Sequence, residues 1–332
     1  MRPTVPLTMP PTKPAAVTAA ELSRVELSEL PAHVPAWPGQ QRGEVFVRRG
    51  RGAAVDREPA LLVHGLGGSS LNWTDLIWLL GDRLDCEAVD LPGFGHSPPS
   101  RHGHGLRTHI RAVIRRIEER GDGPVHLVGN SLGGAVCTVV ATSRPDLVRT
   151  LTLVSPALPT LRPARGADRR LPLLALPGVS RVAGRALRRT SAEQRVQGVV
   201  DLCFADPRRL SDDRRAEMVE EARRRAALGY DGDVFTGALR GLVKTYALRG
   251  DTGMWRRLSR VQVPGLVVWG REDRLVSAAL APRVARTLPD GRLLLLDGVG
   301  HVAQLEAPEV VARALLALVD DQVDSPADDR SG

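Results

Sequence analysis

A single serine between glycines is the residue of this sequence best suited to covalent chemistry. Residues 125–134 read VHLVGNSLGG, an apolar run that leads into Gly129, Ser131 and Gly133 at alternate positions. A serine in a tight turn between a buried strand and a helix presents its hydroxyl beyond the edge of a sheet. Side chains two residues to either side would collide there, so Gly129 and Gly133 are expected to clear space around a nucleophilic Ser131. The alternative for Ser131 is a plain helix N-cap.

A nucleophilic serine needs a base, and the base needs an acid that orients it. His301 lies in the glycine-bearing segment LDGVGHVAQLEAPE after the last strand-like run, where its ring can reach over a sheet edge. Asp273 in VVWGREDRLV follows another strand-like run. The adjacent Glu272 would point to the other side of an extended loop and is the second choice. The predicted catalytic residues are therefore Ser131, Asp273 and His301.

Two main-chain N–H groups are expected to hold the oxygen that becomes negative during attack on a carbonyl. The segment LLVHGLGGSSLNW places His64, Gly65 and Gly67 in a glycine-rich loop after a strand-like run. The expected donors are the N–H groups of Leu66 in this loop and of Leu132 at the start of the helix, where the helix dipole also favours an anion. His64 is predicted to support the loop rather than to act as a base.

None of the other histidines is predicted to take part in catalysis. His126 falls on a core strand, whereas His96, His102, His104 and His109 lie in a polar stretch and are expected at the surface. A metal site at His102 and His104 is the alternative, but no strand or helix spacing makes their side chains converge. We therefore expect no metal and no organic cofactor.

Strand-like runs alternate with helical segments on both sides of the serine, which predicts a mostly parallel sheet with crossover helices. Apolar residues at helical spacing predict a helix over LRTHIRAVIRRIEER, and another is expected over APEVVARALLALVDD. The sheet pattern stops at Pro156 and resumes near residue 263, with arginine-rich helical sequence between. The expected strands are residues 44–49, 60–65, 86–93, 125–129, 147–156, 263–270 and 291–298.

This organisation predicts four parts of the chain. They are a flexible N-terminal arm and lead-in (1–40), a core formed by 41–156 together with 251–320, a helical insertion (157–250), and a disordered acidic tail (321–332). No internal repeat is visible.

The positive charge of the chain is concentrated in the helical insertion. Residues 157–250 hold 19 Lys and Arg against 11 Asp and Glu, which equals the formal charge of +8 for the whole chain. A solvated basic face is the simpler interpretation, and contact with an anionic membrane or with an acidic partner is the alternative. The apolar stretch LPLLALPGV within the insertion is expected to pack on the core or to face lipid. Nothing in the charge pattern points to nucleic acid.

The composition is that of an ordinary globular protein, with 42% apolar and 25% charged residues. No apolar run approaches the roughly 20 residues that span a bilayer, and the first 20 residues lack the apolar centre of a secretion signal. The three cysteines, Cys86, Cys137 and Cys203, are widely separated, which argues against a disulfide framework. We expect a cytoplasmic location.

The sequence resembles the α/β-hydrolase superfamily, specifically the serine hydrolase branch with a helical cap inserted after strand 6. The matching segments are HGLGG (64–68), DLPGFGHS (90–97), GNSLGG (129–134), WGREDRLV (269–276) and GHVAQLEAPE (300–309). They occur in the family's order and cover residues 44–320 apart from the cap. The resemblance implies a mostly parallel eight-stranded sheet flanked by helices, a triad of Ser131, Asp273 and His301, and a substrate pocket beneath the cap.

The residue at the nucleophile position narrows the activity. Haloalkane dehalogenases and epoxide hydrolases of this family carry a carboxylate where this chain has Ser131, so both activities are disfavoured. The Gly-Asn-Ser form of the turn resembles the carbon–carbon hydrolases of aromatic ring cleavage, but those usually carry Trp where this chain has Val302. We predict a hydrolase of carboxylic esters, either acyl lipids or small aliphatic esters, because the cap has few aromatic residues. The alternatives are a carbon–carbon hydrolase and a member that binds a ligand without turnover.

Overall fold

The computed structural model describes residues 14–50, 57–160, 190–247 and 250–323. The predicted apolar stretch of the insertion, residues 171–179, and the end of the acidic tail lie outside this part of the chain. Among the described helices, none combines the length and apolarity needed to cross a membrane.

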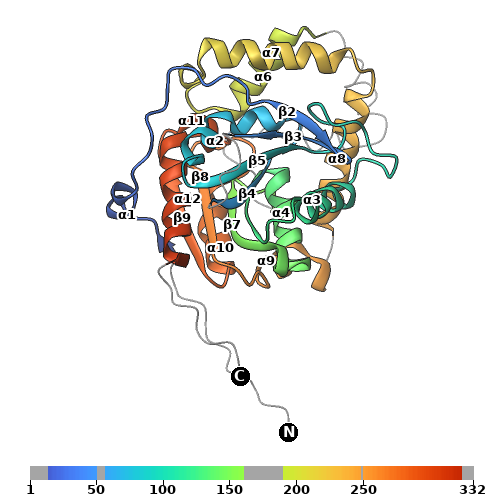
Figure 1. The fold of residues 1–332 in the computed structure, drawn as a ribbon. Helices are drawn as coiled ribbons and strands as arrows, with labels where there is room; N and C mark the ends of the chain where they lie inside the picture. The colour runs from blue at the N-terminus through green and yellow to red at the C-terminus, as the bar shows by residue number, and fades with distance from the viewer. Residues whose placement is uncertain (1–13, 51–56, 161–189, 248–249, 324–332) are drawn as a thin grey trace.

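A sheet of nine strands runs through the molecule in the order β1-β9-β8-β7-β6-β4-β5-β3-β2 (Figure 1). The pairs β2–β3 and β3–β5 are antiparallel and all other pairs are parallel, which confirms the predicted mostly parallel sheet. The strands are β1 (Ala15–Ala16), β2 (Gly39–Arg42), β3 (Val45–Arg49), β4 (Glu58–Val63), β5 (Leu84–Asp90), β6 (Val125–Asn130), β7 (Val148–Val154), β8 (Gly265–Gly270) and β9 (Gly291–Leu296).

The sheet has nine strands where eight are predicted because residues near the N-terminus add an edge strand. Ala15 and Ala16 pair in parallel with Arg292 and Leu293 of β9. A two-residue strand has no alternating pattern that the sequence could reveal.

Helices cover both faces of the sheet, which explains the uninterrupted apolar character of its central strands. Leu61 and Val63 of β4 pack in the cluster that includes α3 and α4, whereas Ala60 and Leu62 pack in the cluster that includes α2 and α12. The helices outside the insertion are α1 (Ala19–Arg24), α2 (Thr74–Leu80), α3 (Leu106–Arg120), α4 (Leu132–Ser143), α9 (Met254–Leu258), α10 (Ala281–Thr287), α11 (Ala303–Glu306) and α12 (Pro308–Val323). Short 3-10 helices are η1 (Ser70–Trp73), η2 (Pro145–Leu147), η4 (Pro207–Arg209), η5 (Gly250–Thr252) and η6 (Ala278–Leu280).

The described part of the predicted N-terminal arm lies along the core. The side chains of Val25 and Val34 are buried, and Arg313 of α12 donates a hydrogen bond to the carbonyl of Val25. Trp37 donates its indole N–H to the carbonyl of Thr74 at 3.0 Å. Residues 14–40 are therefore held by separate buried side chains and hydrogen bonds, and a proline-rich sequence without periodicity does not reveal such contacts.

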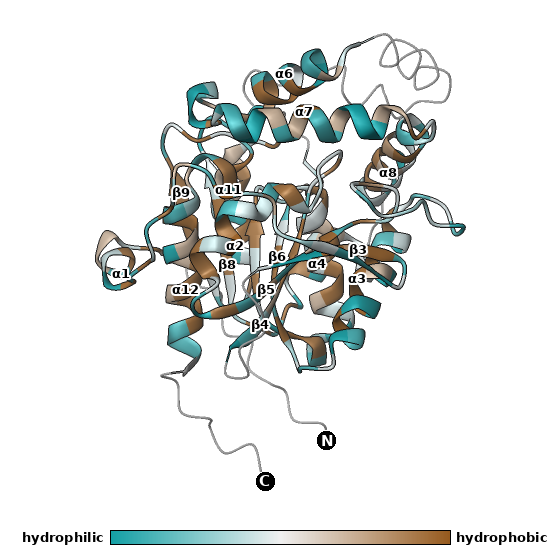
Figure 2. Ribbon diagram, turned by 45° about the horizontal axis from the view of Figure 1, so that its top comes forward, coloured by the Kyte–Doolittle hydropathy of each residue, from teal (hydrophilic) through white to brown (hydrophobic). Residues whose placement is uncertain are grey.

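The described part of the insertion consists of α6 (Ala192–Cys203), α7 (Asp212–Ala226) and α8 (Asp231–Tyr246). We call residues 190–247 the cap helices. Figure 2 shows α6 and α7 lying together above the sheet, while α8 descends towards α3. Gly241 of α8 has room only for hydrogen at its contact with α3, since a Cβ there would lie 2.8 Å from the Cα of Gly105. The cap helices are thus packed closely on the core.

Candidate active site

Ser131 occupies a strained turn between β6 and α4. Its backbone angles are φ 54° and ψ −114°, outside the region that side-chain-bearing residues prefer. The turn is held by the Ser131 N–H, which donates to the carbonyl of Val154 at 3.0 Å, and by the Ser131 carbonyl, which accepts from Ala135 and Ala157. The serine side chain is half-buried, at the end of β6.

The glycines that flank Ser131 stand where a methyl group would collide with main chain. A Cβ on Gly129 would lie 2.6 Å from the carbonyl oxygen of Gly133, and a Cβ on Gly133 would lie 2.2 Å from the carbonyl oxygen of Val63. Real Cβ atoms do not approach main-chain atoms so closely. The spacing of glycines around the serine therefore reflects contact between β6, α4 and β4.

His301 and Asp273 are brought together from loops that follow β9 and β8. The Nδ1 of His301 lies 2.8 Å from Oδ2 of Asp273, and both side chains are buried. The other carboxylate oxygen of Asp273 accepts hydrogen bonds from the N–H groups of Leu275 and Val276, at 2.8 and 2.9 Å. With Nδ1–H donating to the carboxylate, Nε2 is the nitrogen that can accept a proton. Within the part of the chain that the structure describes, Nε2 has no hydrogen-bond partner.

Glu272 takes a different place from its neighbour. Its side chain is exposed and accepts a hydrogen bond from the Val299 N–H at 3.0 Å. Of the two candidate acids, Asp273 is the one that contacts His301.

Asn130 ties the turn at Ser131 to the loop between β9 and α11, residues 297–302, which we call the histidine loop. Its side-chain amide donates to the carbonyl of Val154 at 3.1 Å and to the carbonyl of His301 at 3.2 Å. The residue is buried and immediately precedes Ser131. The sequence offers no physical reason for an asparagine here, because both of its partners are distant in the chain.

The glycine-rich loop lies directly against the serine turn. A Cβ on Gly65 would lie 3.1 Å from the Cβ of Ser131. Among the described residues, the Leu66 N–H makes no hydrogen bond, and the Leu132 N–H is the first of α4 and has no partner within the helix. Neither N–H group is engaged by another described residue, so their expected role as oxyanion donors stays a prediction.

His64 fixes the start of this loop as a neutral ring. Its Nδ1 donates to the carbonyl of Gly65 at 2.7 Å, and its Nε2 accepts from the Leu91 N–H at 2.9 Å. Burial lowers the pKa of His64 to about 4, a direction that the nearby Arg225 reinforces. Since both nitrogens are engaged by main chain, His64 is in no position to act as a base.

The histidine loop also contacts the cap. The His301 N–H donates to the carbonyl of Cys203, the last residue of α6, at 2.7 Å. Glu306 accepts from the Gly300 N–H at 2.6 Å on one oxygen and from the Ala205 N–H at 2.9 Å on the other. Burial raises the pKa of the Glu306 carboxyl. Glu306 lies in the segment GHVAQLEAPE, and its sequence position does not reveal that it joins Gly300 to Ala205.

The surface position predicted for His109 is wrong. The ring is fully buried at a centroid distance of 5.9 Å from Phe94, and neither ring nitrogen has a hydrogen-bond partner among the described residues. Burial lowers the pKa of His109 to about 3. The prediction fails because His109 lies on the inner face of α3. His126 is buried as predicted, with Nε2 2.7 Å from Glu58.

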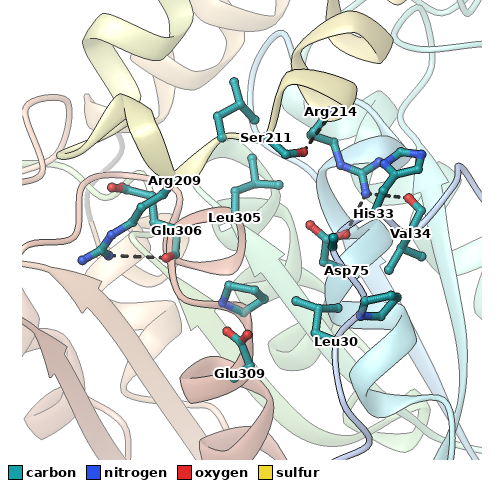
Figure 3. Close-up of a pocket in the computed structure, with 14 residues that line it drawn as sticks. Leu30, His33, Val34, Asp75, Arg209, Ser211, Arg214, Leu305, Glu306 and Glu309 are labelled. Carbon is teal, nitrogen blue, oxygen red and sulfur yellow. Dashed lines mark hydrogen bonds and ion pairs between the residues drawn. The ribbon is translucent and has the colours of Figure 1, made fainter.

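A cavity of about 310 Å³ lies beside the histidine loop but does not include Ser131. It is bounded by residues 30–34, the start of α7 and the junction of α11 with α12 (Figure 3). Arg214 spans its wall, donating to Asp75 at 2.6 Å and to the carbonyl of Val34 at 2.8 Å. The cavity thus lies between residues 30–34 and the start of α7. The buried Arg214 of α7 joins its two sides by the hydrogen bonds to Val34 and Asp75.

Several known proteins are similar to this chain. Dihydrolipoyllysine-residue acetyltransferase components of acetoin cleaving systems from Pseudomonas putida and Cupriavidus necator are 32% and 30% identical over 85% and 79% of this chain. The chain spans 70% and 62% of their lengths. The 2-hydroxy-6-oxononadienedioate/2-hydroxy-6-oxononatrienedioate hydrolase of Burkholderia vietnamiensis is 26% identical over 78% of this chain and 86% of its own.

A solved structure and a family model agree on the fold. The crystal structure of a membrane phospholipase A, a bacterial virulence factor, matches 92% of this chain and 90% of its own with a TM-score of 0.68, at 23% identity. The model of the α/β-hydrolase family matches residues 60–314. This range contains Ser131, Asp273 and His301 and the predicted donors Leu66 and Leu132. With its mostly parallel sheet and strained serine turn, the chain belongs to the α/β-hydrolase family.

Proposed function

We propose that this chain is a serine hydrolase that cleaves carboxylic esters through an acyl-enzyme on Ser131. The observation that carries the proposal is the 2.8 Å contact between His301 Nδ1 and Asp273 Oδ2. The residue before the strained Ser131, Asn130, donates a hydrogen bond to the carbonyl of this His301. A carboxylate that accepts Nδ1–H leaves Nε2 as the acceptor, which is the arrangement that activates a serine hydroxyl.

The proposed reaction has two steps. In the first, Ser131 Oγ attacks the carbonyl carbon while His301 Nε2 takes its proton, the N–H groups of Leu66 and Leu132 hold the oxyanion, and the leaving alcohol receives the proton from His301. In the second, His301 takes a proton from water, which attacks the acyl carbon. The bond to Ser131 Oγ then breaks, His301 gives its proton to Oγ, and the acid is released. Asp273 keeps Nδ1 protonated and stabilises the imidazolium. No step requires a metal or an organic cofactor.

A small aliphatic ester or an acyl lipid is the proposed substrate. The serine at the nucleophile position and the resemblance to acyl-transferring relatives support acyl transfer. The buried, free cysteines Cys86 and Cys137, whose pKa values burial raises, are consistent with the cytoplasmic location that we propose. We do not extend the proposal to a membrane, because many described cap arginines are engaged by carboxylates and carbonyls of the chain itself.

Carbon–carbon hydrolysis is the second candidate. The Gly-Asn-Ser turn and the relative from Burkholderia vietnamiensis favour it. The Val302 that follows the histidine weighs against it.

One panel of substrates tests the proposal. We expect p-nitrophenyl esters to be hydrolysed, with a rate that depends on acyl length, and a ring-cleavage dienone to be hydrolysed slowly or not at all. Ser131→Ala is expected to reduce kcat by at least about 10³-fold, and a fluorophosphonate probe is expected to label Ser131 alone. Faster turnover of the dienone would favour carbon–carbon hydrolysis. If neither substrate class were hydrolysed and the probe did not label Ser131, the proposal would be wrong, and a protein that binds a ligand without turnover would be favoured.

A further inference from the structure

Three consecutive arginines end helix α7 and have different surroundings. The side chain of Arg223 is 58% exposed and pairs with Glu193 inside the cap, whereas that of Arg225 is only 12% exposed. Arg224 pairs with Glu221 at 2.7 Å and donates to the carbonyl of Gly95. Of the three, Arg225 is the one that reaches the loop of Leu66, where Nη1 donates to the carbonyl of Gly67 at 2.7 Å.

Arg225 is fixed from three directions. Its Nε lies 3.0 Å from Oδ1 of Asp231, at the start of α8. Its guanidinium carbon lies 5.6 Å from the ring centroid of Phe94 in the core. Because a planar guanidinium that lies over a ring within cation–π range and donates to a carboxylate has little freedom left, its third contact, to Gly67, has a defined direction.

The hydrogen bond from Arg225 is accepted by Gly67, a residue whose own backbone preferences do little to fix the conformation of the loop. Gly67 has φ +78°, and glycine has almost no intrinsic preference between neighbouring backbone states. The turn is closed on one side by the Gly68 N–H, which donates to the carbonyl of Gly65 at 3.1 Å. On the other side a Cβ at Gly67 would lie 3.2 Å from Phe235 of α8. Arg225 therefore holds the peptide unit between Gly67 and Gly68. The N–H of that unit donates to the carbonyl of Gly65, which belongs to the same peptide unit as the Leu66 N–H.

We propose that Arg225 is a positioning residue that docks the cap on the glycine-rich loop and holds the Leu66 N–H towards Ser131. The inference rests on the proposed function, since it concerns the oxyanion donors of that reaction. It assigns a role to one arginine of the basic insertion: the oxyanion site is complete only while the C-terminal end of α7 is seated on Gly67. The cap then contributes to the chemical step as well as to covering the substrate.

The test compares Arg225→Gln with Arg223→Gln, the matched exposed neighbour, and with Arg224→Gln, which loses a different carbonyl contact. For each variant kcat and KM are measured with p-nitrophenyl butyrate, together with the rate constant of inactivation by a fluorophosphonate, whose phosphoryl oxygen needs the same donors. We expect Arg225→Gln to lower kcat and the inactivation rate constant by about 10-fold or more, less than deletion of an oxyanion donor, with KM changed little. Arg223→Gln and Arg224→Gln are expected to stay within about 3-fold of the parent chain.

Folding is separated from positioning by two further measurements. Thermal unfolding is recorded for every variant, and if Arg225→Gln does not fold, Arg225→Lys takes its place, because a lysine can reach one carbonyl but cannot also pair side-on with Asp231. Low millimolar guanidinium is added to Arg225→Ala and is expected to restore part of kcat.

The inference is overturned if a folded Arg225 variant keeps the kcat and inactivation rate constant of Arg223→Gln, or if only KM rises. Failure of the parent chain to hydrolyse esters or to react with the fluorophosphonate would instead overturn the proposed function.

Discussion

The side-chain amide of Asn130 donates a hydrogen bond to the main-chain carbonyl of His301 at 3.2 Å, and so joins the residue before the nucleophile to the residue proposed as its base. The same amide donates to Val154 at 3.1 Å. One nitrogen thereby links β6, β7 and the loop after β9. His301 is also held by Asp273 and by the carbonyl of Cys203, and the Asn130 amide is the contact that joins it directly to the residue before Ser131.

Replacing Asn130 by Asp tests this link. The carboxylate has nearly the same shape but cannot donate to two carbonyls, so we expect the histidine loop to shift and kcat for ester hydrolysis to fall by about 10- to 100-fold. Steady-state kinetics check the effect, with Gln194→Glu on the exposed start of α6 as the control. An Asn130→Asp chain with parental kcat would show that the histidine loop is positioned without the amide.

Asp273 and Glu272 make a matched pair of neighbouring acids. Asp273→Asn is expected to lower kcat by about 10³- to 10⁴-fold, since an amide can present its N–H groups to His301 and favour the wrong tautomer. Glu272→Gln should change kcat by less than about 3-fold, because its side chain is exposed and its one hydrogen bond among the described residues comes from the Val299 N–H, which an amide oxygen can still accept. Both values come from the same ester assay. If both variants lost kcat to the same extent, Asp273 could not be the acid that orients His301.

The sequence was sufficient to predict the parallel sheet because its signals are local. The run VHLV, the glycines around Ser131 and the periodic apolar residues of α3 each report on neighbours in the chain. The contacts that assemble the site are not local. Asn130 with His301, Glu306 with Ala205 and Arg225 with Gly67 join residues that lie about a hundred or more positions apart. The burial of His109 is not evident from the sequence for a related reason. The residue follows a polar stretch, and its burial depends on which face of α3 packs against the core.

The buried histidines predict how stability responds to acid. The pKa of His109 is lowered from 6.5 to about 3 in the folded chain. Below pH 6.5 the unfolded chain binds a proton at this ring and the folded chain does not, so the free energy of unfolding falls by about 1.4 kcal/mol per pH unit as the pH decreases towards 3. The stabilising contribution is complete above pH 6.5. His64, with a pKa of about 4, acts in the same direction over a narrower window.

Substitution of His109 isolates one of these two effects. His109→Leu leaves no hydrogen bond broken among the described residues and is expected to flatten the decline in urea-unfolding free energy between pH 6.5 and 4 by about 1 kcal/mol per pH unit. The exposed His102→Gln serves as the control and should leave the slope unchanged. Parallel pH profiles for His109→Leu and the parent chain would mean that His109 is not kept neutral in the folded state.

Two glycines in helices predict opposite effects of the same substitution. A Cβ on Gly133 of α4 would lie 2.2 Å from the carbonyl oxygen of Val63 and 2.6 Å from that of His64, both of them main-chain atoms that cannot turn away. A Cβ on Gly198 of α6 would meet no atom within 4 Å.

We expect Gly133→Ala to lower the free energy of unfolding by about 3 kcal/mol or more and to abolish fluorophosphonate labelling. Gly198→Ala should raise it by about 0.5 to 1 kcal/mol with activity unchanged, because alanine loses less backbone entropy in a helix. Urea denaturation of the two variants measures both values. If Gly133→Ala were tolerated like Gly198→Ala, the close contact of α4 with the end of β4 could not be what requires glycine beside the serine.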